Sequence, residues 1–440
     1  MVKKIAIVGA GPSGVLLAHY LLRRGDRYQV DLYERLNDPR TTPFSTSRTY
    51  PISLNERGMN ALSQIPGLQE AIGAIGLEMW GTLFHQTNGK TRTTSRTKPL
   101  MTLDRTRLVM LLLDQLSQTY DASRLNLHFN CPCTQVDFAT KTICFQTEAA
   151  AVTAEYDLLV GADGARSVVR GQFLNTELFE FEQKYTPTDY KSIILPRSDR
   201  QSAVDLEVGK IHSWRIKDGT VVVLLHQPDG AMSGVILFPR HQNQVASLAT
   251  PQAVRTFFLR HFPEVEQRMP ESEVEAFLQR PTSRILTIRC SHYHYRDSVL
   301  LIGDAAHSVS PSIGQGCNAA LEDVVIFDTL LDECVDDLGA AIEQFTLRRK
   351  ADAHALVELG DYAFPATTGL FIEFVFRQRF ADLLHRRFPH RFAPSLATLV
   401  FETSVPYSEI LQSHQGWISK VKRSNEKSLS AGRRKNHRGS

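Results

Sequence analysis

One stretch near the start of the chain decides the fold: Lys4-Ile-Ala-Ile-Val-Gly-Ala-Gly-Pro-Ser-Gly14. Its apolar first half predicts a buried β-strand, and the apolar spacing from Val15 to Arg24 predicts a helix after it. In this G-x-G-x-x-G pattern the first glycine allows a tight turn and the second lets the backbone approach a pyrophosphate. The third glycine lets the helix lie close to the strand. With a second predicted strand over Tyr28–Tyr33, the stretch forms a β–turn–α–β unit.

An acid follows that second strand. Glu34 lies about 20 residues beyond the glycines, where a carboxylate hydrogen-bonds a ribose hydroxyl of a bound dinucleotide. An acid there disfavours a 2′-phosphate, so we expect FAD or NAD rather than NADP at this site. Arg35 either neighbours the adenine or is a plain surface charge. The residues predicted to bind the dinucleotide are Gly9, Gly11, Pro12, Ser13, Gly14, Glu34 and Arg35.

Two more glycine-rich blocks follow predicted strands. Gly161-Ala-Asp-Gly164 comes after Tyr156–Val160 and places Asp163 at a strand end. Gly303–Val324 comes after Ser298–Ile302 and runs into a predicted helix from Asn318. The N-terminus of a helix carries partial positive charge and unpaired N–H groups, which suit an anionic cofactor. Taken alone, each block is equally compatible with an ordinary turn or crossover.

The middle of the chain changes character. Residues 190–240 are rich in β-formers, and Pro228-Asp-Gly230 supplies a hairpin turn, so an antiparallel sheet is expected. Residues 253–278 and most of 318–412 read as helical. The predicted fold class is α/β: a Rossmann-type FAD-binding domain interrupted by an antiparallel β substrate domain, with a C-terminal helical region. The expected segments are 1–80, 101–175 and 285–345 for the FAD-binding domain, 81–100 and 176–284 for the substrate sheet and domain, 346–417 for the helical region and 418–440 for a tail.

Composition and charge narrow the class of protein. The chain is 42% hydrophobic and 22% charged, as in soluble globular proteins. Its six cysteines form no C-x-x-C pair, so neither a zinc ribbon nor a disulfide framework is expected, and no metal site is predicted. Residues 418–440 carry eight Lys or Arg and one Glu, and we expect this tail to be disordered. We expect a cytoplasmic protein whose basic tail either contacts an anionic membrane peripherally or is simply solvated. No nucleic-acid partner is expected, and the oligomeric state stays open.

The three separated blocks together resemble the single-component FAD-dependent aromatic hydroxylases, the p-hydroxybenzoate hydroxylase fold. The resemblance implies that the first motif holds the ADP half of FAD. It implies that Asp163 serves both FAD and a transient NAD(P)H, and that Asp304 holds the ribityl chain. Arg105 at a predicted helix start resembles the family's arginine near the flavin.

Two segments are similar to the kynurenine 3-monooxygenases in particular. They are Arg48-Thr-Tyr-Pro-Ile-Ser-Leu-Asn-Glu-Arg-Gly58 and Gly314-Gln-Gly-Cys-Asn-Ala-Ala-Leu-Glu-Asp323. The resemblance implies that NAD(P)H reduces FAD, that O₂ adds to it, and that the resulting hydroperoxide hydroxylates an aromatic small molecule. The cofactor-binding residues that it adds are Arg48, Arg105, Asp163, Gly303, Asp304, Gly314, Gln315, Gly316, Cys317 and Asn318.

The predicted substrate pocket departs from these enzymes. Thr82 stands where they place an arginine for the substrate carboxylate, and Leu396 stands where a tyrosine is expected. Arg92 or Arg96 either replaces the missing charge or is plain surface. The predicted substrate is therefore kynurenine-like or more hydrophobic, and epoxidation of an isoprenoid or a non-catalytic redox scaffold stays open. The pocket residues expected are Thr82, Phe84, Phe238, Pro239, Pro311, Ile313, Asn318 and Leu396; no catalytic acid or base is assigned, and His85 and His307 are expected to be structural.

Overall fold

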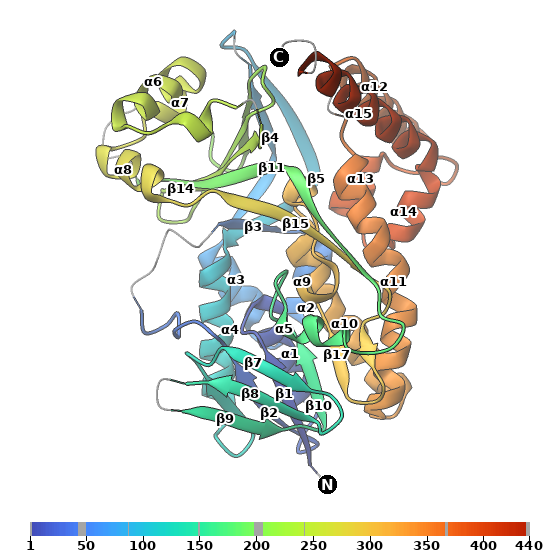
Figure 1. Cartoon of the computed structure of the whole chain (residues 1–440). Helices are drawn as coiled ribbons and strands as arrows, with labels where there is room; N and C mark the ends of the chain where they lie inside the picture. The colour runs from blue at the N-terminus through green and yellow to red at the C-terminus, as the bar shows by residue number, and fades with distance from the viewer. Residues whose placement is uncertain are drawn as a thin grey trace.

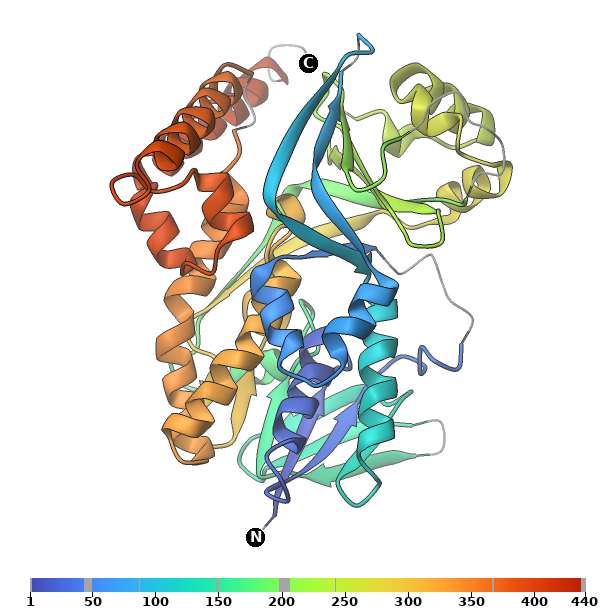
Figure 2. The same ribbon diagram turned by 180° about the vertical axis from the view of Figure 1, so that it is seen from behind.

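The computed structural model describes residues 2–42, 50–86, 88–147, 150–197, 206–241, 243–365 and 368–436. Figure 1 shows a sheet near the N-terminus, a second sheet above it, and helices along one side of both, and Figure 2 gives the opposite view. The expected α/β fold with an inserted antiparallel sheet and a C-terminal helical region is confirmed.

A six-stranded sheet surrounds the opening strand. Its order is β16 (His294–Tyr295), β17 (Val299–Leu301), β10 (Leu158–Gly161), β1 (Lys3–Val8), β2 (Tyr28–Tyr33) and β6 (Leu125–His128). Every neighbouring pair is parallel except β16 with β17. Because β1 lies between β10 and β2, its last four residues are buried on both faces, as an unbroken apolar run predicts.

The helix after β1 is enclosed on every side. All residues of α1 (Pro12–Leu22) are buried, between the sheet and the helices around it. Tyr20 donates to the carbonyl of Ala61 at 2.6 Å, and the ring of His19 bonds the carbonyl of Leu112 at 2.9 Å. α1 packs against α4 (Arg105–Thr119) and α10 (Gly316–Glu333), and Ala61 belongs to α2 (Glu56–Ser63). Next to them, α3 (Leu68–Ile75) packs against α2 and α4, and α5 (Val168–Phe173) packs against β10.

The second sheet has eight strands. Its order is β15 (Ser283–Cys290), β11 (Phe181–Leu195), β14 (Met232–Pro239), β13 (Val221–His226), β12 (Ile211–Arg215), β4 (Leu77–His85), β5 (Thr91–Asp104) and β3 (Pro51–Leu54). One face packs against α6 (Pro251–His261), α7 (Pro263–Glu266) and α8 (Glu271–Gln279) to form its own core. The single helix expected over 253–278 is divided into three because a proline begins α7 and another caps α8.

A third, smaller sheet was not expected as a separate unit. It contains β7 (Cys133–Asp137), β8 (Thr142–Gln146) and β9 (Ala151–Glu155), all antiparallel. These three strands therefore lie outside the parallel sheet. Short helical segments complete the list of elements: η1 (Val245–Ser247), α9 (Asp304–His307) and η2 (Pro311–Ile313).

Long helices occupy the C-terminal part: α11 (Leu338–Tyr362), α12 (Thr368–Arg387), α13 (Leu396–Glu402), α14 (Tyr407–Ser413) and α15 (Gln415–Asn436). The tail expected to be disordered is instead helical through Asn436. Its start is anchored because Trp417, Ile418 and Val421 are buried in the core of these helices. Within the described ranges, no helix is long and apolar enough to cross a membrane.

The buried His19 predicts a measurable loss of stability in acid. Burial lowers the pKa of His19 from 6.5 to about 4, although the hydrogen bond with the Leu112 carbonyl acts to raise it. The unfolded chain therefore takes up a proton as the pH falls below 6.5 and the folded chain does not, so stability falls until about pH 4. Between pH 7 and pH 5 we expect His19 to account for a loss of about 2 kcal/mol of unfolding free energy.

Urea unfolding at both pH values measures this loss. His19→Gln keeps an N–H donor for the Leu112 carbonyl and does not titrate, so its unfolding free energy should fall less between pH 7 and pH 5. An unchanged pH dependence in H19Q would show that His19 does not carry the effect.

Candidate active site

Four predicted motifs meet at one edge of the six-stranded sheet. The N–H of Gly9 donates to Tyr33 at 2.7 Å, that of Ala162 to Val8 at 2.8 Å, and that of Ile302 to Gly161 at 3.0 Å. These bonds continue the ladder just beyond the strands, so the turns after β1, β2, β10 and β17 lie side by side. The carboxyl edge of a parallel sheet is where open α/β folds bind ligands.

The first glycine turn is closed by its neighbours. Gly9 has φ +108°, and an added Cβ would lie 2.4 Å from the carbonyl oxygen of Ala162. A Cβ on Gly14 would lie 2.1 Å from the carbonyl oxygen of Gly9. Gly11 is open by contrast, since its nearest neighbour would be Nη2 of Arg105 at 3.8 Å. No side chain caps α1, so the N-terminus of that helix keeps free N–H groups beside an open backbone.

Glu34 extends from β2 over this turn. Its carboxylate accepts the N–H of Ala10 at 2.9 Å and that of Leu36 at 3.0 Å. The side chain is half-buried, so its position beside the glycine turn is fixed by the backbone. Arg35 is exposed.

Asp163 has one oxygen without a partner. Oδ2 accepts the N–H groups of Val168 at 2.7 Å and Val169 at 3.3 Å, which positions the start of α5. Oδ1 is buried and accepts no hydrogen bond from the described residues. Burial raises the pKa of this carboxyl, although its hydrogen bonds act to lower that pKa. A buried carboxylate oxygen is costly to leave unpaired, so the geometry suits a donor supplied by a bound molecule.

Asp323 of α10 holds the third glycine turn. Gly303 has φ +58°, and its N–H donates to Asp323 Oδ2 at 2.8 Å. The same oxygen bonds His307 Nε2 at 2.6 Å, and Oδ1 accepts Arg349 Nε at 2.6 Å. Burial opposes ionisation, but the positive charges of His307 and Arg349 and these hydrogen bonds keep the pKa of Asp323 below its ordinary value. His307 is thus bonded within the protein.

Four side chains mark a concave surface beside this turn. Asp304 is exposed to water, and Tyr50, Arg105 and Cys317 are half-exposed. Burial nevertheless raises the pKa of Asp304, of Tyr50 and of Cys317, the last two to about 12. Side chains that are accessible yet desolvated by surrounding protein line a cavity rather than a convex surface. The guanidinium of Arg105 lies over the ring of Tyr50, 5.8 Å from its centroid.

The loop before α10 is stabilised from within. Asn318 is fully buried; it accepts the N–H of Asn55 at 3.0 Å and donates to Ser53 at 2.9 Å. Gln315 accepts from Asn55 at 3.1 Å and from Tyr407 at 3.0 Å. These two side chains, predicted to touch ligands, already have protein partners. Their observed part is to hold Gly314 (φ +60°), Gly316 and Cys317 in place at the N-terminus of α10, which no side chain caps.

Strand register decides which predicted pocket residues share a face. Directly paired residues on neighbouring strands share a face, and Phe84 is in line with Ser213, Val223 and Val235. The residues next to these in sequence, Trp214, Val222 and Ile236, form the core under α6–α8. Phe84, and Thr82 two residues before it, therefore lie on the opposite face. Pro239 falls on that same face by alternation. His85 lies on the opposite face, bonded to His212 at 2.9 Å and stacked on Trp214.

Three expected pocket residues are buried in hydrophobic cores instead. Phe238 is 1% exposed and belongs to the core under α6–α8. Side chains alternate along β14, so Leu237 and Pro239 lie on the opposite face of the sheet. Ile313 and Leu396 are each 2% exposed and lie in the core of the C-terminal helices. Pro311 is exposed, and Arg48 lies outside the described residues.

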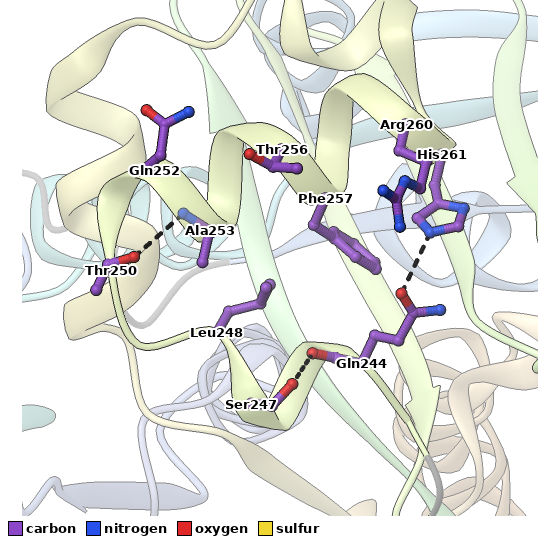
Figure 3. A pocket seen from close by; sticks show the side chains of 10 residues that line it. All are labelled: Gln244, Ser247, Leu248, Thr250, Gln252, Ala253, Thr256, Phe257, Arg260 and His261. Atoms are coloured by element: carbon purple, nitrogen blue, oxygen red, sulfur yellow. Dashed lines mark hydrogen bonds between the residues drawn. The ribbon is translucent and has the colours of Figure 1, made fainter.

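Sequence reasoning missed the supports of the site. Asp323, Arg349 and Asn55 hold the two glycine loops, but their partners lie 20 to 263 residues away. Asp323 and Asn55 lie within the two segments similar to the kynurenine 3-monooxygenases, but neither was predicted to act as a support, and Arg349 lies in no motif. A separate hollow of about 470 Å³ lies between η1 and α6, lined by polar side chains such as Gln244 and His261 (Figure 3). It contains none of the predicted site residues.

The carboxylate of Asp323 predicts a large stability effect. Asp323→Asn removes the charge that Arg349 and His307 face and replaces one acceptor with a donor. Breaking a buried ion pair from one side costs about 3 kcal/mol or more. Urea unfolding should show this loss, whereas Glu333→Gln, which breaks the exposed pair with Arg348, should leave stability nearly unchanged. Equal effects of D323N and E333Q would contradict the assigned role.

The chain matches a family model described as "FAD binding domain" over residues 3–358. It is 33% identical to the kynurenine 3-monooxygenase of Salinispora arenicola over 426 residues, which cover 93% of this chain and 90% of that protein. It is 29% identical to the violacein synthase of Chromobacterium violaceum over 426 residues, covering 93% and 96%.

Among solved structures, the tetrameric form of 2-methyl-3-hydroxypyridine-5-carboxylic acid oxygenase superposes with a TM-score of 0.70. The match covers 90% of this chain and 99% of that one at 18% identity, so it supports the fold. The family model and the sequence relatives together give the family. The chain belongs to the FAD-binding monooxygenases, an oxidoreductase family that includes the kynurenine 3-monooxygenases.

Proposed function

We propose that this protein is an FAD-dependent monooxygenase that uses NAD(P)H and O₂ to hydroxylate an electron-rich aromatic small molecule. The observation that supports it best is the meeting of an open glycine turn, an unpaired Asp163 oxygen and the accessible but desolvated Asp304 at one sheet edge. The donor set and the free backbone at this edge fit a dinucleotide that carries both a pyrophosphate and sugar hydroxyls.

Each part of FAD has protein groups to hold it. The N-terminus of α1 at Gly11 offers N–H groups and partial positive charge to the pyrophosphate. Glu34 is the acceptor for a ribose hydroxyl, and Asp304 is the acceptor for a hydroxyl of the ribityl chain. Asp163 Oδ1 accepts a further donor. Arg105 supplies a positive charge without an ion-pair partner among the described residues.

The protein's contribution to the chemistry is positioning, shielding and charge. Bound FAD supplies two-electron transfer and activation of O₂, with one oxygen entering the aromatic ring and the other leaving as water. The uncapped N-terminus of α10 and Arg105 would stabilise negative charge on the cofactor. The sheet face that carries Thr82, Phe84 and Pro239 would cover the substrate and exclude water.

The substrate is proposed to be aromatic because the sequence relatives include kynurenine 3-monooxygenases. Thr82 supplies no charge, so a carboxylate on the substrate would need another cationic partner. The epoxidase alternative had rested on an apolar Leu396 in the pocket, and that side chain lies in the helical core. A non-catalytic redox scaffold has no observation in its favour.

We also propose peripheral contact with an anionic membrane for the C-terminal helices. α12 exposes Ile372, Phe376 and Phe380, and the nearby α15 exposes Lys422 and Arg423. Co-sedimentation with phosphatidylserine vesicles tests this contact, and its absence at low salt would rule it out.

A substrate screen tests the proposed activity. We expect the purified yellow protein to oxidise NADH or NADPH slowly alone, and much faster with aromatic acids, aminoaromatics or indoles, forming a hydroxylated product. Stimulation by terpenoids with epoxide formation would favour the epoxidase. A protein that binds FAD but oxidises no added compound would be a redox scaffold, and the proposed function would be wrong.

Asp304 should control retention of the cofactor. Asp304→Ala removes one hydrogen bond to FAD, which is worth roughly tenfold in affinity. Titration of the apoprotein with FAD, followed by flavin fluorescence, measures the change. Asp332→Ala is the matched control, because Asp332 is 71% exposed and its one ion pair among the described residues is with Arg24. Equal FAD affinities for D304A and D332A would contradict the assignment.

A further inference from the structure

A half-buried arginine lies unpaired beside the predicted substrate face. Arg96 is on β5, two residues beyond Thr94, the ladder partner of Thr82. Its Nε is buried and has no hydrogen-bond partner, and within the described part of the chain no carboxylate lies within ion-pair distance. Burial lowers the pKa of Arg96, against the attraction of Glu402. An arginine removed from water without an anion is a costly arrangement.

Other buried arginines of this protein do have partners. Arg349 pairs with Asp323, Arg57 with Glu322 and Arg280 with Glu273. Arg170, which lacks an acid, donates to the carbonyls of Ala305 and Ala165. Arg96 instead has an aromatic ring, with its guanidinium 4.9 Å from the ring centroid of Phe401. Stacking orients a planar guanidinium and leaves its edge free to bind.

A bulge in β5 places Arg96 in this position. The ladder with β4 runs regularly from His85 to Gly81, opposite Thr91 to Ser95. The register then shifts, so that Leu100 pairs with Met79, and residues 96–99 have no partner on β4 although β5 continues through them. Bulges often redirect a side chain next to a functional site. The bulge is fixed to α13 by Glu402, which accepts the N–H of Thr97 at 3.1 Å and also its hydroxyl.

Arg96 is connected to the cofactor loop through α13. Phe401, under the guanidinium, directly follows Val400, whose carbonyl accepts Asn55 Nδ2 at 3.5 Å. Asn55 also donates to Gln315 in the loop before α10. The unpaired charge therefore lies between the sheet face, α13 and that loop, which are the three walls expected around a substrate.

We propose that Arg96 binds the carboxylate of the substrate, so that this enzyme acts on anionic aromatic molecules. The inference rests on the proposed function and narrows its substrate class. A carboxylate can take two parallel hydrogen bonds from the guanidinium edge while its aromatic body lies along the sheet face. Thr82 on the adjoining strand supplies no charge, so the proposal assigns the distinction between an acid and a neutral analogue to Arg96.

Two probes that differ only in charge test the proposal. The FAD-loaded enzyme is titrated with 2-aminobenzoate and with 2-aminobenzamide, and binding is measured by calorimetry and by the change in the visible flavin spectrum. We expect the wild type to bind the acid at least about tenfold more tightly than the amide. Arg96→Gln should weaken binding of 2-aminobenzoate by about 30-fold and leave the affinity for 2-aminobenzamide unchanged.

Control variants separate charge from structure. Arg96→Lys keeps the charge but not the paired donors, and should retain part of the preference for the acid. Arg348→Gln removes an exposed arginine that pairs with Glu333, away from the proposed site, and should retain all of the preference. Thermal unfolding and flavin content identify any variant that fails to fold. If R96Q does not fold, the preference of R96K for the acid over the amide is compared with that of the wild type.

The outcomes distinguish the two proposals. If the wild type does not prefer the acid, or if R96Q retains the preference, the role of Arg96 is wrong. If neutral aromatics are then hydroxylated with NAD(P)H, the proposed monooxygenase function still stands. If no aromatic compound of either charge is oxidised, the proposed function fails as well.

Discussion

The site depends on one buried carboxylate. Asp323 binds the N–H of Gly303, the ring of His307 and the guanidinium of Arg349, all within 2.8 Å. These bonds fix the turn after β17 to α10 and fix α10 to α11. Without them the left-handed Gly303 turn would lose its support, and Asp304 would not be held beside the glycine turn of β1. A charge buried this deeply is stable only because all of its partners are present at once.

The rest of the site follows from the sheet. Parallel strands end at one edge, so turns that lie up to 294 residues apart in sequence become neighbours there, as with Gly9 and Gly303. A Cβ on Gly303 would lie 3.0 Å from the hydroxyl of Ser13, which shows how closely the first and third motifs meet. The face of the second sheet that carries Thr82 and Phe84 is the one proposed to cover the substrate. Arg105 and Arg96 have no ion pair among the described residues, and we propose that the first serves the cofactor and the second the substrate.

Local sequence patterns predicted the parallel sheet and its glycine turns well. A glycine turn between a strand and a helix depends on residues within about ten positions, so the stretch at Lys4–Gly14 is enough to specify it. The face of β14 could not be predicted in this way. Phe238 and Pro239 alternate, and which of them faces the site depends on which side α6–α8 cover. Asn55 and Arg349 bind partners 263 and 26 residues away, and no local pattern around either residue indicates which partner it has.

The helical tail, which differs from expectation, and the pocket position of Leu396, which stays a prediction, depend on packing in the same way. The basic composition of residues 418–440 predicted disorder, but Trp417, Ile418 and Val421 are spaced to bury one side of a helix. Leu396 matched a pocket position by resemblance, yet the helical core takes its side chain. The sequence offered Arg92 and Arg96 equally as a replacement for the missing charge. Arg96 is desolvated and unpaired because α13 and the irregular part of β5 surround it, and neither can be predicted from local sequence.

A crystal structure of the protein grown with FAD would test the assembled site. The account predicts cofactor density along the carboxyl edge of the six-stranded sheet, with the pyrophosphate at Gly11, hydrogen bonds to Glu34 and Asp304, and a partner for Asp163 Oδ1. Density elsewhere on the protein, or a cofactor at this edge that leaves Asp163 and Asp304 without contacts, would contradict it.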